Sequence, residues 1–262
     1  MATSPTDIYT LMVVSRIYAA INRQDEAMAT LDRALAIKPD ASIYLNRFAI
    51  RPKRDLAGRQ ADLDAALRLE PTSADALFDQ AQLAGERGDW TAAVATLTRL
   101  IATGPHNGEW LGRRGIAYAK AGDRAAADKD FDAARALAGD AHALNGLCWM
   151  KAQAGVALER ALAECDAAMA MTPGAADVED SRALVLLRLD RVKDALAQYQ
   201  AILAKVPTQA PSLYGRAVAE ARTGDPAGAA RDAAAALKID PRLAEAFDDY
   251  GLALKVPTTG AH

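Results

Sequence analysis

The sequence has few residues of the kinds that build metal and redox centres. Its 262 residues include only two cysteines and three histidines, His106, His142 and His262. Zinc sites built on Cys and His clusters need more of these residues, as does the c-type haem attachment motif. The sequence therefore predicts neither a metal site nor a cofactor.

Long apolar runs and an excess of one charge are also missing. No apolar run approaches the roughly 20 residues that span a bilayer, so we expect no membrane insertion. Lys and Arg number 31 against 34 Asp and Glu, which gives no electrostatic basis for binding nucleic acid. No signal peptide is visible at Met1–Asp7, which favours the cytoplasm by default, or the periplasm if the chain is part of a larger exported protein.

Enzyme motifs are missing as well. The sequence has no glycine-rich phosphate loop ending in Lys-Ser or Lys-Thr, and no Gly-x-Ser-x-Gly elbow. Gly108, Gly112 and Gly115 are spaced loosely like a nucleotide loop but fall within an expected helix. The carboxylates alternate with Arg and Lys, which is typical of solvated helix faces. We therefore expect no catalytic residue and no enzymatic activity.

What the sequence does have is an internal repeat. Seven segments of the sequence end at Pro39, Pro71, Pro105, Gly139, Pro173, Pro207 and Pro241. The first two of these residues are 32 positions apart, and each later pair is 34 positions apart. Gly-Asp pairs mark the middle of several segments, at Gly88-Asp89, Gly122-Asp123 and Gly224-Asp225. Such a glycine can end one helix in a left-handed conformation, and the aspartate can cap the next. Each segment therefore predicts a helical hairpin.

Small residues recur where two helices of a hairpin must approach closely, and large apolar residues recur one turn away. In one segment these are Leu111, Gly115, Tyr118, Gly122, Ala127, Phe131 and Ala134. This pattern resembles the tetratricopeptide repeat (TPR) family. The resemblance implies an all-α, right-handed superhelical solenoid of seven repeats, near 8–41, 42–73, 74–107, 108–141, 142–175, 176–209 and 210–243.

Around the solenoid, 8–241, we expect a leader at 1–7, a capping helix at 242–257 and a tail at 258–262. The second repeat is two residues short, which predicts a tight turn at Arg51-Pro52-Lys53. At the other end of the array, the capping helix should present a polar outer face. No cap precedes the first repeat, so Val13 and Ile17 are either partly exposed or covered by another domain or another copy.

In the TPR family, first helices line a concave groove that holds partner peptides. Carried over by position, the groove would consist of Met12, Arg16, Asn46, Arg47, Phe78, Asp79, Gln82, Arg113, Ile116, Asn145, Trp149, Asp180, Leu184, Tyr214 and Val218. Central anchors are best shielded from water, which favours Phe78, Arg113 and Trp149. Trp149 could instead pack between repeats.

Cys148 and Cys165 fall on the two helices of one repeat, where the family's packing would bring their side chains together. They are either two buried thiols or a disulfide, and a disulfide needs an oxidising compartment.

The resemblance implies a non-catalytic scaffold that binds a peptide or protein segment in the groove. Chaperone-binding members hold a carboxylate with a clamp of Lys, Asn and Arg, but here Met12 and Arg16 stand where Lys and Asn are expected. An alternative is that the chain is the repeat region of a larger bacterial protein, transglutaminase-like or other, with its catalytic domain elsewhere. The segment Leu144–Trp149 is similar to such regions.

Overall fold

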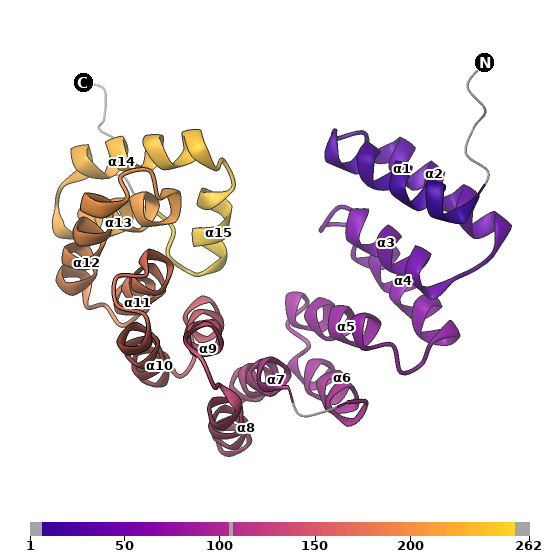
Figure 1. The fold of residues 1–262 in the computed structure, drawn as a ribbon, viewed down its shortest axis with the longest axis horizontal. Helices are drawn as coiled ribbons and strands as arrows, with labels where there is room; N and C mark the ends of the chain where they lie inside the picture. The colour runs from indigo at the N-terminus through magenta and orange to yellow at the C-terminus, as the bar shows by residue number, and fades with distance from the viewer. Residues whose placement is uncertain (1–6, 105–106, 255–262) are drawn as a thin grey trace. The chain divides into compact units, whose positions relative to one another are not determined.

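The fold consists of helices throughout the part of the chain that the computed structural model describes, residues 7–104 and 107–254. Fifteen helices and no strand occur in these residues (Figure 1). The expected all-α fold of seven helical hairpins followed by one further helix is therefore confirmed. Pro105, His106, His262 and the expected tail lie outside the described residues, as does nearly all of the leader.

The chain divides into two compact units, with the boundary between residues 106 and 107. Unit 1 contains three hairpins, formed by α1 (Ile8–Ala20), α2 (Gln24–Ile37), α3 (Ala41–Ile50), α4 (Leu56–Leu69), α5 (Ala74–Glu86) and α6 (Trp90–Ala102). Unit 2 contains four hairpins and a short last helix, namely α7 (Gly108–Ala121), α8 (Arg124–Leu137), α9 (Ala141–Ala154), α10 (Leu158–Met171), α11 (Ala176–Arg188), α12 (Val192–Lys205), α13 (Ala210–Thr223), α14 (Pro226–Ile239) and α15 (Leu243–Asp249).

The turns within hairpins follow the Gly-Asp signal. Gly122 and Gly224 adopt left-handed conformations, with φ of 91° and 90°, and end α7 and α13. The carboxylates of Asp89, Asp123 and Asp225 each accept a hydrogen bond from a backbone N–H in the first turn of the following helix. These contacts satisfy N–H groups that have no partner within the helix, and they confirm the predicted caps.

The predicted tight turn of the second hairpin is wrong. Helix α3 ends at Ile50 and α4 begins at Leu56, so five residues connect them. Arg51, which precedes Pro52, has an extended ψ of 141°, because a proline disfavours the helical conformation in the residue before it. The deletion thus shortens the first helix rather than the turn. The Arg51 side chain binds Asp55 and Asp62, which fastens this longer connection to α4.

Close helix packing inside hairpins depends on small residues. A Cβ atom added to Gly115 on α7 would lie 2.6 Å from the ring of Phe131 on α8. The largest continuous core runs from α9 to the C-terminal residues and includes Cys148, Tyr199, Tyr214, Phe247 and Leu252. The last helix thus belongs to the core of unit 2.

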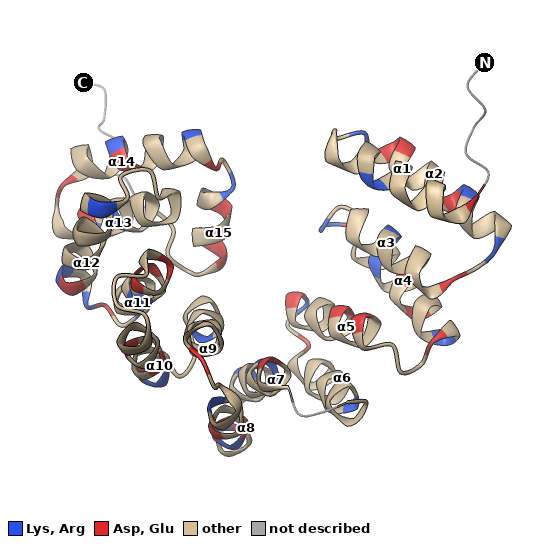
Figure 2. Cartoon of the chain, viewed as in Figure 1, with Lys and Arg blue, Asp and Glu red and all other residues tan. Residues whose placement is uncertain are grey.

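Helix α15 is shorter than the capping helix predicted for 242–257. It ends at Asp249, and Gly251 turns the chain with a φ of 69°. No helix within the described ranges is long and apolar enough to cross a bilayer. Acidic and basic residues are interspersed along the helices of both units (Figure 2).

Candidate functional site

In unit 1 the first helices bring several predicted groove residues together. Arg16 on α1 donates a hydrogen bond from Nε to Oδ1 of Asn46 on α3, at 3.0 Å. Met12 is partly buried against the core of the first hairpin. Gln82 on α5 is exposed, and its amide lies 3.5 Å from the Glu86 carboxylate. The Arg16–Asn46 hydrogen bond links α1 to α3 through polar side chains.

Arg47, also predicted to line the groove, is held by carboxylates of its own unit. Its guanidinium binds Asp32 on α2 and the fully buried Asp62 on α4. An arginine whose N–H groups already donate to two carboxylates has few donors available for a ligand. Its observed role is therefore to tie α3 to both neighbouring helices.

Phe78 and Asp79 line a small cavity of about 300 Å³ together with Asn46 and Asp75. Burial, together with the nearby Asp75 charge, raises the pKa of the Asp79 carboxyl to about 6. Both effects disfavour the charged form of Asp79.

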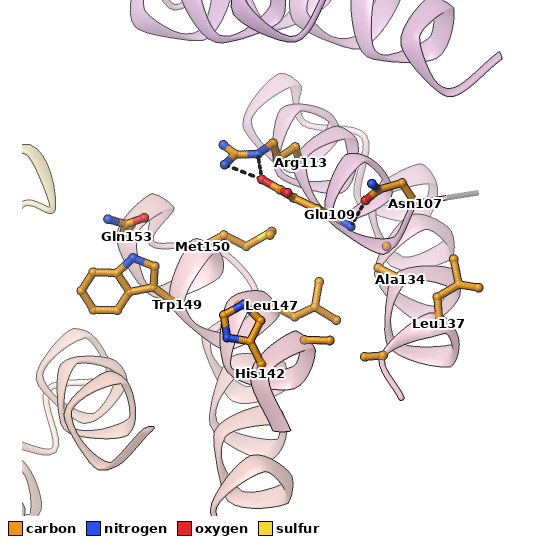
Figure 3. A pocket seen from close by; sticks show the side chains of 14 residues that line it. Asn107, Glu109, Arg113, Ala134, Leu137, His142, Leu147, Trp149, Met150 and Gln153 are labelled. Carbon is orange, nitrogen blue, oxygen red and sulfur yellow. Dashed lines mark hydrogen bonds and ion pairs between the residues drawn. The ribbon is translucent and has the colours of Figure 1, made fainter. Parts of the chain in front are cut away.

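A larger cavity, of about 530 Å³, lies in unit 2 between the α7–α8 hairpin and α9 (Figure 3). We call it the α7–α9 cavity. Its apolar side chains come from Leu137, Leu147, Met150 and Trp149. Polar groups also line it, supplied by Asn107, Glu109, Arg113, His142 and Gln153.

The polar groups on the α7 side of this cavity already have partners. Arg113 binds Glu109 one turn earlier on the same helix, with 2.8 Å between nitrogen and oxygen. The Asn107 side chain accepts a hydrogen bond from the Glu109 backbone N–H at 2.8 Å and so caps α7. Arg113, predicted as a central anchor of the groove, therefore lines the cavity as one partner of an ion pair.

Sequence reasoning missed several lining residues on α9. Only Trp149 was predicted among the α9 residues that line the cavity, and the others include His142, Gly146, Met150 and Gln153. His142, Gly146, Trp149 and Gln153 follow the spacing of one helical face. Extending the predicted Asn145–Trp149 face by one turn in each direction would have found His142 and Gln153.

Four residues expected to line the groove are buried. Asp180, Leu184, Tyr214 and Val218 have exposed fractions of 8%, 1%, 3% and 1%. Asp180 accepts a hydrogen bond from Ser212 on α13, and the C-terminal residues pack on Tyr214. Phe247 on α15 contacts Tyr214, with ring centroids 4.8 Å apart. Trp149 is partly covered in the same way, because Tyr250 meets it edge-on at 5.9 Å.

The other predicted residues of unit 2, Ile116 and Asn145, are not among the residues that line the α7–α9 cavity. Ile116 on α7 and Asn145 on α9 are both half-buried. The Asn145 side-chain oxygen is buried and has no hydrogen-bond partner among the described residues.

Cys148 and Cys165 are joined by a disulfide between α9 and α10, with Cα atoms 5.5 Å apart. Both residues are fully buried. Within the described ranges no group of three or more His, Cys, Asp or Glu residues could hold a metal ion.

Helix α1 exposes an apolar stripe. Tyr9, Val13, Ile17 and Ile21 follow one another at intervals of four residues, and Tyr9 is 77% exposed. In unit 1 no described helix covers Val13 or Ile17. These are the two residues that the sequence predicted to be either partly exposed or covered by another domain or another copy.

Comparison with known families finds one match. A family model described as "Tetratricopeptide repeat" matches residues 60–108, 78–142 and 181–254. Together these matches cover more than half of the chain. No curated protein sequence matches it.

Solved structures share the fold at low sequence identity. A tetratricopeptide repeat protein from Parabacteroides merdae is 17% identical with a TM-score of 0.66, covering 94% of this chain and 98% of that one. Yeast Tom70 is 14% identical with a TM-score of 0.65, covering 93% of this chain and 53% of its own. The Thermus thermophilus TPR protein TTC0263 is 20% identical with a TM-score of 0.51, covering 69% and 99%. This chain thus spans about half of the Tom70 chain.

Proposed function

The chain belongs to the tetratricopeptide repeat family, and we propose that it is a non-catalytic interaction module that holds a peptide or protein segment against the first helices of unit 2. The observation that carries this proposal is the α7–α9 cavity. Its volume of about 530 Å³ falls within the range of about 300–1,000 Å³ that is typical of ligand sites.

The cavity suits a partner that inserts an apolar side chain. Leu147, Met150 and Trp149 supply apolar surface, and polar groups flank it. Arg113 already binds Glu109, so a partner carboxylate would have to compete with that pair. A partner with an apolar anchor and neutral polar neighbours therefore fits better than one held by a carboxylate clamp.

A peptide library tests the proposal across partners of any sequence. Peptides displayed on phage would be selected on the immobilised full chain, synthesised with a fluorescent label, and measured by fluorescence anisotropy. We expect enriched peptides to share an apolar anchor residue. A selection that enriches no peptide able to bind the full chain in solution would contradict the proposal.

Replacing Trp149 with Ala locates the site. If Trp149 is an anchor, the affinity of a selected peptide should fall by about 2 kcal/mol, as is typical of hot-spot residues. The melting temperature must be measured on the same variant, because Trp149 also packs against Tyr250. A variant that melts earlier but binds the peptide with unchanged affinity would show that Trp149 only packs.

A second candidate is that the chain works as the repeat region of a larger protein with a catalytic domain elsewhere. The apolar stripe on α1 favours it, because exposed apolar patches of this kind often mark interaction sites. Reading the gene upstream of the Met1 codon tests this candidate. An in-frame domain there would support it, and a stop codon directly upstream would oppose it.

A further inference from the structure

The C-terminal segment, defined here as residues 243–254, is attached to unit 2 by its apolar side chains. Leu243, Phe247 and Leu252 are buried, and Tyr250 and Leu254 are partly buried against the same core. Asp248 and Asp249 between them are exposed. The segment therefore lies on unit 2 with an apolar face inward and an acidic face outward.

Its contacts reach three of the first helices of unit 2. Phe247 packs on Tyr214 of α13, beside which α15 lies (Figure 1). A Cβ atom added at Gly251 would lie 3.0 Å from the guanidinium of Arg188 on α11. Tyr250 contacts Trp149 of α9, and Gln153 donates a hydrogen bond from Nε2 to the Tyr250 hydroxyl at 2.9 Å. This last contact joins residues 97 positions apart.

The segment therefore covers the surface that would otherwise continue the α7–α9 cavity. Trp149 and Gln153 line that cavity and also contact Tyr250. The buried Leu184, Tyr214 and Val218 belong to the same core as Phe247 and Leu252. Removing the segment would expose the ring surfaces of Tyr214 and Trp149 that Phe247 and Tyr250 now contact.

The segment has little structure of its own to hold it in place. Helix α15 has seven residues, whereas isolated helices shorter than about 12 residues are marginal in water. It is held mainly by the apolar side chains named above, of which Leu243, Phe247 and Leu252 are buried. Regions with few such contacts can open without global unfolding.

We propose that the C-terminal segment is an intramolecular ligand of this face, and that the partner is a protein segment with the same chemistry that displaces it. That chemistry is an aromatic residue, a second aromatic residue three positions later and a leucine two positions after that, as at Phe247, Tyr250 and Leu252. The inference rests on the proposed function, since it names the partner class and the regulation of that face.

The test uses a labelled peptide of residues 243–254 and the full chain. In the wild type the tethered segment competes at an effective concentration of the order of millimolar, so a micromolar probe should not bind detectably. In the Phe247→Ala/Tyr250→Ala variant the probe should bind at least about tenfold more tightly than to the wild type, because its competitor has lost both aromatic anchors. A probe with the same two substitutions should not bind.

Asp249→Ala is the matched control, because it changes an exposed residue of the same segment and leaves the apolar contacts in place. It should behave like the wild type. A double variant that keeps its helical circular dichroism and a cooperative melt but does not bind the probe would overturn the proposal. A dimer formed by exchanging segments between two copies, seen by light scattering, would also overturn it.

Hydrogen exchange on the wild type keeps the test decisive if the double variant does not fold. Residues 243–254 should exchange through an opening of lower free energy than that of α11–α14, and equal free energies would contradict the proposal.

Failure of this inference is distinguishable from failure of the proposed function. If library-selected peptides bind the wild type and the Tyr250→Ala variant equally well, the interaction module stands and the displacement does not.

Discussion

Lys151 on α9 and Glu164 on α10 form a buried ion pair, with Nζ 2.8 Å and 2.7 Å from the two carboxylate oxygens. Neither side chain is more than 2% exposed. Burial lowers the pKa of the Lys151 ammonium and raises the pKa of the Glu164 carboxyl. The ammonium also lies 4.7 Å from the centroid of the Phe131 ring, so the pair links two neighbouring hairpins.

Removing one partner of this pair should be far more damaging than removing both. Lys151→Met leaves the Glu164 carboxylate buried without its cation, and we expect it to lower the free energy of unfolding by about 3–5 kcal/mol. The Lys151→Met/Glu164→Leu variant should recover most of this loss. Urea denaturation of the three proteins measures it. A double variant no more stable than the single one would contradict this account.

The sequence predicted the hairpins because their signals are local. Gly122 and Asp123 determine a turn and a cap within a few residues, whatever surrounds them. The tight turn predicted at Arg51 is wrong because Pro52 disfavours a helical conformation in Arg51, so the two missing residues shorten α3 and not the turn. The position of Tyr250 against Gln153 could not be predicted, since a contact across 97 residues leaves no periodic pattern.

Two glycines on first helices should respond in opposite ways to added side chains. Gly115→Leu should destabilise by roughly 1–3 kcal/mol, because extra methylene groups would be forced against Phe131. Gly146→Ala should stabilise by about 0.5–1 kcal/mol, because alanine favours the helix and a Cβ there meets no described atom within 4 Å. Thermal melts test both, and an unchanged melting temperature for Gly115→Leu would contradict the packing described here.

Asp180 should make stability depend on pH. Its carboxyl accepts a hydrogen bond from Ser212, and burial raises its pKa to about 6 from a usual 3.8. The folded protein therefore binds this proton more tightly than the unfolded chain does. The resulting stabilisation is complete below about pH 3.8 and is lost as the pH rises through about 6.

The Asp180→Asn variant isolates this effect. Relative to the variant, the wild type should lose about 3 kcal/mol of unfolding free energy over that pH range, at about 1.4 kcal/mol per pH unit. Urea denaturation of both proteins at several pH values measures the difference. A difference that stays constant with pH would contradict the assignment to Asp180.

The disulfide should stabilise the α9–α10 hairpin. Cys148 and Cys165 are 17 residues apart, and closing a loop of about this length contributes on the order of 3 kcal/mol in the chain-entropy model. A reductant should therefore shift the denaturation midpoint of the wild type downward. The Cys148→Ala/Cys165→Ala variant should denature at the same midpoint with and without reductant. If complete reduction leaves the denaturation midpoint of the wild type unchanged, the disulfide contributes nothing to stability.

The proposed binding face is tested most directly by filling the α7–α9 cavity without disturbing the fold. Gly146 lines the cavity, so Gly146→Leu places a side chain in it, and Gly146→Ala is the matched control. The measurement is the dissociation constant of one library-selected peptide for both variants. Binding to this face predicts an affinity at least about tenfold weaker, or 1.4 kcal/mol, for Gly146→Leu than for Gly146→Ala. Equal affinities for two equally folded variants would contradict it.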